Sequence, residues 1–121
     1  DVTIFATGVM VHRALQAAAA LADGGIDAAV VNVPTVKPLN GEALLTLAAR
    51  TRRVLTCEDH SVLGGFGSAV AEALAPTGIP VSLLGVNDCF GQSARSEAEL
   101  VAHYGLTAED IAARVRALIT P

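Results

Sequence analysis

Two kinds of hydrophobic pattern alternate along the chain. Short runs of consecutive apolar and β-branched residues, bounded by turn residues, predict four strands that are buried on both faces. These runs are Val2–Ala6, Ala28–Val33, Arg53–Glu58 and Val81–Gly85. Strands of this kind are typical of parallel sheets that carry helices on both sides.

Segments with apolar residues every three or four positions separate these strands and predict helices. The first runs from about Val11 to Ala22 before Gly24-Gly25, the second begins after the capping residue Asn40, and the third runs from about Gly67 to Ala75. Ser96–Glu99 and Thr107–Asp110 resemble the caps of two further helices.

The order of these elements, βαβαβαβαα, predicts one α/β domain with a mostly parallel sheet and helices on both faces. A length of 121 residues suits a single domain, here 1–121. The chain is 52% hydrophobic but only 3% aromatic, so the core must consist of small aliphatic side chains. Because the chain begins at Asp1, we expect it to be a fragment of a longer protein.

Charge and hydropathy exclude several classes of function. The net charge is −4 and no run of Lys or Arg is present, which argues against nucleic-acid binding. No apolar stretch is long enough to cross a membrane. Cys57 and Cys89 lack the spacing of metal ligands, so two free thiols in a reducing, cytoplasmic compartment are expected.

Polar residues follow the predicted strands. In an open parallel sheet the carboxyl ends of the strands share one edge, where sites are found. Glu58, Asp59, His60 and Asp88 are expected at this edge. They could perform acid–base chemistry or hold a divalent cation, but a polar edge that meets a neighbouring domain is the favoured interpretation.

A glycine cluster precedes the third helix and consists of Gly64, Gly65 and Gly67, followed by Ser68. Backbone N–H groups at such a helix start can bind an anion. However, the third glycine of a dinucleotide fingerprint is replaced by Val70, and no Gly-Lys-Ser/Thr ending is present. A tight turn with close packing of the helix on the sheet is the competing interpretation.

The stretch EDHSVLGGFGSAVAE, Glu58–Glu72, resembles a signature of the transketolase C-terminal domain. Further similarity lies in Val2–Gly8, Asn32–Pro34, Lys37–Leu39, Phe90–Gly91 and Tyr104–Ile111, and thus covers nearly the whole chain. The chain departs from the family pattern at Val9-Met10, Asp59 and Ala94, where Ser-Glu, Glu and Gly are frequent.

The resemblance implies a three-layer α/β/α domain with a five-stranded mixed sheet. It also implies a homodimeric parent enzyme that transfers two-carbon ketol units between sugar phosphates. In that family other domains hold thiamine diphosphate and its magnesium ion through a Gly-Asp-Gly motif, which this sequence lacks. We therefore expect a non-catalytic domain that binds no cofactor itself, and whose Glu58 and His60 hydrogen-bond to a neighbouring cofactor-binding domain.

Two alternatives remain open from the sequence. The chain could be the partner-binding end of a split transketolase, a 1-deoxyxylulose-5-phosphate synthase or a 2-oxoacid dehydrogenase β subunit. It could also be a stand-alone domain that binds a nucleotide or another small anion at the turn formed by residues 64–68.

Overall fold

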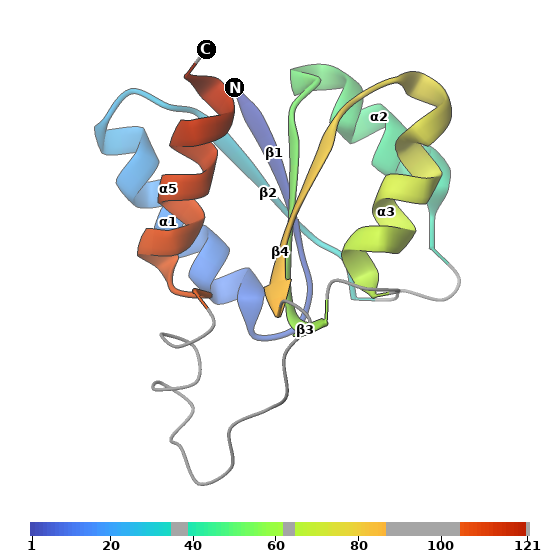
Figure 1. Cartoon of the computed structure of the whole chain (residues 1–121). Coiled ribbons are helices and arrows are strands. Elements are labelled where there is room, and N and C mark those ends of the chain that lie inside the picture. The colour runs from blue at the N-terminus through green and yellow to red at the C-terminus, as the bar shows by residue number, and fades with distance from the viewer. Residues whose placement is uncertain (35–38, 62–64, 87–104, 121) are drawn as a thin grey trace, which may run out of the picture.

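The protein forms three layers, with a central sheet between two pairs of helices (Figure 1). The computed structural model describes residues 1–34, 39–61, 65–86 and 105–120. Its strands are β1 (Val2–Ala6), β2 (Ala28–Asn32), β3 (Val54–Ser61) and β4 (Val81–Val86). Its helices are α1 (Met10–Asp23), α2 (Gly41–Thr51), α3 (Phe66–Leu74) and α5 (Ala108–Ile119), with a 3₁₀ turn at Ala75–Thr77.

The four strands are arranged in the order β2-β1-β3-β4, and every pair of neighbours is parallel. A helix follows each of β1, β2 and β3 and returns the chain to the starting edge, and this connection makes successive strands parallel. The mixed sheet expected from the family resemblance is corrected accordingly, because the described residues form an all-parallel sheet of four strands. The expected fifth strand does not occur among them.

Two apolar cores lie on the two faces of the sheet. On one face α1 and α5 pack over Ile4 and Leu55. On the other face α2 and α3 pack over Phe5 and Val54. Neighbouring residues of one strand thus enter opposite cores, which explains why β1 is buried along its whole length.

The helix starts agree with the caps that the sequence predicts. Asn40 Oδ1 accepts a hydrogen bond of 3.2 Å from the N–H of Ala43 at the start of α2. Thr107 and Asp110 form a reciprocal capping box at the start of α5. The helix predicted after Ser96–Glu99 lies outside the described residues. The sequence predicts that β3 ends at Glu58, but the strand continues to Ser61.

Gly67 allows α3 to lie unusually close to the sheet. A Cβ atom at this position would lie 2.5 Å from Thr56 Oγ1 and 2.8 Å from Leu83 Cδ2. These distances are shorter than van der Waals contact, so any side chain here would push the helix away from β3 and β4. The sequence-based interpretation of the glycine as a packing device is supported at this residue.

We predict that Gly67→Ala destabilises the protein by about 1–2 kcal/mol, because the added methyl overpacks the contact with Thr56 and Leu83. Gly41→Ala is the matched control, since a Cβ at Gly41 meets no atom within 4 Å. It should be neutral or stabilising by about 0.5 kcal/mol. Urea unfolding of both variants measures the difference. Equal stabilities would contradict the close approach of α3 to the sheet.

Candidate functional site

The carboxyl ends of β1, β2 and β3 meet at one edge of the sheet, which we call the carboxyl rim (Thr7–Val9, Asn32 and Glu58–His60). Ala6 is in register with Asn32 on one side and with Cys57 on the other. β1 and β3 are neighbours, but their connections run in opposite directions across the sheet. The chain passes from β1 to β2 on one side and from β3 to β4 on the other. Open α/β sheets place their binding sites at such a switch point.

Glu58 is fully buried at this rim, and its carboxylate faces the start of α3. Oε2 accepts a hydrogen bond of 2.8 Å from the N–H of Phe66, and Oε1 accepts one of 3.0 Å from the N–H of Gly67. These N–H groups belong to the first turn of the helix and have no partner within it. The charge of Glu58 is therefore stabilised by two charge-assisted hydrogen bonds and by the helix dipole.

This arrangement differs from the roles that the sequence predicts for Glu58 and for the N–H groups at the start of α3. The sequence placed Glu58 among side chains that face a neighbouring domain, whereas both of its oxygens accept hydrogen bonds from inside this one. The same bonds occupy two of the N–H groups that an external phosphate would need. The helix start thus already holds an anion, supplied by the protein itself.

β3 and β4 lose their regular register at the rim. Cys57 pairs with Leu84 and Ser61 pairs with Val86, so three residues of β3 lie opposite one residue of β4. An irregularity of this kind bends a strand and redirects its side chains. Asp59 and His60 lie within this irregular stretch, and Asp59 is half-buried.

The other site residues predicted from the sequence lie partly in α3 and partly outside the described residues. Gly65 caps α3 in an extended conformation, and Ser68 is half-buried in the first turn of that helix. Gly64 and Asp88 lie outside the described residues, as does the side chain of His60. The structure therefore joins Glu58 to the glycine turn, while the expected proximity of Asp88 to Glu58 stays a prediction.

Cys57 is buried beneath the rim and is not a reactive thiol. Burial raises its pKa from 9.0 to about 12, while Arg114 lowers it and Glu58 raises it further. The thiolate is the nucleophilic form of cysteine, and this environment suppresses it. The sequence-based interpretation of Cys57 as an inert core residue is supported.

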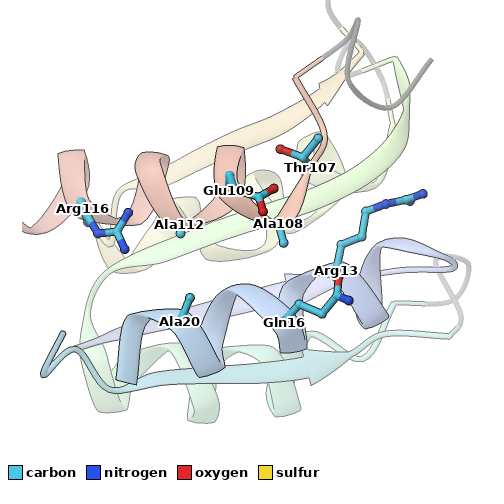
Figure 2. Close-up of a pocket in the computed structure, with 8 residues that line it drawn as sticks. All are labelled: Arg13, Gln16, Ala20, Thr107, Ala108, Glu109, Ala112 and Arg116. Carbon is cyan, nitrogen blue, oxygen red and sulfur yellow. The ribbon is translucent and has the colours of Figure 1, made fainter. Parts of the chain in front are cut away.

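A hollow lies away from the rim, between α1 and α5 (Figure 2). It has a volume of about 510 Å³ and is lined by Arg13, Gln16, Ala20, Thr107, Ala108, Glu109, Ala112 and Arg116. Its two arginines come from opposite helices, and Glu109 adds a carboxylate. None of the site residues predicted from the sequence lines this groove.

Clusters of metal ligands and membrane-spanning helices are both absent from the part of the chain that the structure describes. Its His, Cys, Asp and Glu side chains form no group of three or more that could hold a metal ion. None of its helices combines the length and the apolar character needed to span a bilayer.

We predict that Glu58→Ala destabilises the protein by about 3 kcal/mol, because it leaves the N–H groups of Phe66 and Gly67 buried without an acceptor. Glu58→Gln keeps one acceptor oxygen but turns an N–H₂ group toward a donor, so about 2 kcal/mol is expected. The control Glu72→Gln changes an exposed residue of the same helix and should stay within about 0.5 kcal/mol. Equal urea midpoints for the Glu58 and Glu72 variants would contradict the capping role.

We predict that Cys57 resists alkylation in the folded protein. A pKa raised from 9.0 to about 12 lowers the thiolate fraction near pH 8 roughly 1,000-fold. In a Cys89→Ser variant, iodoacetamide should therefore react with the remaining thiol at least about 100-fold more slowly in buffer than in urea. The raised pKa also makes stability fall above pH 9, where the unfolded thiol ionises and the buried one does not. Equal alkylation rates in buffer and urea would show that Cys57 is accessible.

Comparisons with known proteins agree with this architecture along nearly the whole chain. Residues 1–111 match the family model described as "Transketolase, C-terminal domain". A solved structure described as a split gene transketolase, inactive β4 tetramer, superimposes with a TM-score of 0.91 at 48% identity. The match covers 98% of this chain and 39% of that one.

The curated relatives include proteins named for two different enzymes. A 6-deoxy-6-sulfo-D-fructose transketolase subunit from Clostridium sp. (strain MSTE9) is 50% identical over 112 residues, which cover 92% of this chain and 34% of the relative. A 1-deoxy-D-xylulose-5-phosphate synthase from Synechococcus sp. (strain JA-2-3B'a(2-13)) is 48% identical over 119 residues, which cover 97% and 18%. The chain thus spans about a third or less of these relatives. It belongs to the transketolase C-terminal domain family.

Proposed function

We propose that this chain is the C-terminal docking domain of a transketolase subunit that works together with a partner subunit. The observation that carries the proposal is the likeness, over nearly the full chain, to a transketolase subunit and to a split gene transketolase. The chain covers only 34% and 39% of these proteins. In this function the domain stabilises an assembly and carries out no chemical step.

The geometry of the carboxyl rim supports docking at this edge. Gly8 is exposed with a φ of 60°, and Val9 next to it is 49% exposed. The irregular end of β3 lies beside this turn, because Thr7 N–H donates to the carbonyl of Cys57 at 3.3 Å. The rim thus combines an apolar contact residue, a backbone turn without a side chain and polar groups, which suits contact with another protein surface.

The chemistry of the rim supports a non-catalytic role. Glu58 is the most deeply buried acid there, and α3 uses both of its oxygens. Cys57 stays protonated across the physiological range, since burial raises its pKa to about 12. We infer that thiamine diphosphate and its magnesium ion are held by the other domains of the assembly, which also supply the acid–base groups.

A second candidate is the corresponding domain of a 1-deoxy-D-xylulose-5-phosphate synthase. The identity to such an enzyme is 48%, close to the 50% for the transketolase subunit. Product analysis on the native enzyme separates the two functions. Formation of 1-deoxy-D-xylulose 5-phosphate would favour the synthase, whereas ketol exchange between two sugar phosphates would favour transketolase.

We predict that His60→Ala in the native protein that carries this segment weakens its association with the partner subunit about tenfold, because a polar contact at the rim is lost. Arg50→Ala is the control, since Arg50 is exposed in the last turn of α2, at the opposite edge of the sheet. Partner affinity can be measured by titration calorimetry, and folding by urea unfolding. Unchanged partner affinity in the His60 variant would count against docking through the rim.

A further inference from the structure

Alternate residues of β3 turn their backbone groups toward its two neighbouring strands. The N–H of Thr3 donates to Arg53 O at 2.9 Å, and the N–H of Thr7 donates to Cys57 O at 3.3 Å. The odd-numbered residues of β3 therefore face β1, and the even-numbered ones face β4. Thr3 is in register with Val54 but bonds to the residue before it, so each bonded pair is offset from the register by one position.

The same rule places the backbone groups of Leu83 at the outer edge of β4. Thr56 faces β4 and is in register with Leu83, so its bonding partners there are Ser82 and Leu84. The N–H and C=O groups of Leu83 then point away from β3. Because β4 is the last strand in the order β2-β1-β3-β4, these groups lie at an edge of the described sheet.

Arg114 reaches this edge from the helix layer. Its Nη1 donates a hydrogen bond of 3.2 Å to Leu83 O, although the two residues lie 31 positions apart in the chain. Because the donor is charged, such a hydrogen bond is stronger than one between neutral groups. A strand that paired with β4 at this position would have to displace the contact.

β4 itself lacks the features that protect most edge strands. Natural sheet edges carry charged side chains, proline or bulges. The strand VSLLGV contains no charge and no proline. The additional residues of its irregular pairing belong to β3. Short uncharged segments of this kind pair readily with copies of themselves, so β4 requires protection from another element.

Packing of α5 does not supply this protection. A hollow of about 430 Å³ lies between β4 and α5, and its lining includes Leu83, Gly85, Asp110 and Arg114. Arg114 is exposed beside this hollow. Among the described residues, its guanidinium therefore covers a carbonyl that the helix itself leaves open.

We propose that Arg114 guards the outer edge of β4 and keeps it from pairing with β4 of a second copy. Its hydrogen bond uses the central carbonyl of the outward row, which Val81, Leu83 and Gly85 form. Its charge adds to the effect, because two copies paired through β4 would bring their Arg114 side chains close together and remove water from them. The guard acts along a strand edge and does not depend on docking through the carboxyl rim.

The experiment compares Arg114→Ala with Arg116→Ala in the native protein that carries this segment. Arg116 is an exposed residue of the same helix that lines the groove toward α1, so it is the matched control. Sedimentation velocity at increasing concentration should show Arg114→Ala associating beyond the wild-type assembly, with an association constant raised at least about tenfold. Arg116→Ala should behave as the wild type. Hydrogen exchange should show protection of the Leu83 amide that rises with concentration in Arg114→Ala alone.

A second variant separates pairing at the edge from a loss of folding. When Ser82→Lys is added to Arg114→Ala, a lysine on the strand itself should protect the edge and restore the wild-type assembly. Urea unfolding of each variant checks that the domain stays folded. Association that the lysine does not reverse would assign it to unfolded chains and would overturn the proposal. Equal association of Arg114→Ala and Arg116→Ala would overturn it as well.

Discussion

The fold depends on one carboxylate that reaches from the sheet to the start of a helix. Glu58 lies in β3, and its two oxygens accept the N–H groups of Phe66 and Gly67. A buried charge is tolerated only when its acceptors are satisfied, so α3 has to begin where these groups can meet. The contact also requires a residue without a side chain at position 67. The position of α3 then fixes one of the two cores, to which Val70 and Leu74 belong.

The sequence predicts the class, the order of elements and several helix caps, because these depend on local patterns. Consecutive apolar residues identify β1 correctly, and Asn40 and Thr107 mark real helix starts. The role of Glu58 could not be read in this way, since its partners lie eight and nine residues farther along the chain and across a turn. A capping box has a fixed spacing of three residues, whereas this contact depends on how β3 and α3 pack.

The end of β3 lies farther along the chain than the sequence predicts, for a related reason. Asp59, His60 and Ser61 are polar, so they resemble a loop, yet they continue the strand. The apolar pattern that identifies a strand is lost where the strand extends beyond the helices that cover it, because polar side chains are tolerated there. A glycine turn that follows a strand ending in an acid is the signal that could have located the capping contact.

The irregular pairing of β3 with β4 has a consequence for how this domain can change over evolutionary time. The additional residues lie between two paired positions, Cys57 with Leu84 and Ser61 with Val86. Within this stretch Glu58 is fixed by its contact with α3, whereas Asp59 and His60 follow it at the rim. Substitutions at these two positions can accumulate while the anchoring contact of Glu58 stays, so one scaffold can be adapted to differently shaped neighbours while its interior stays the same.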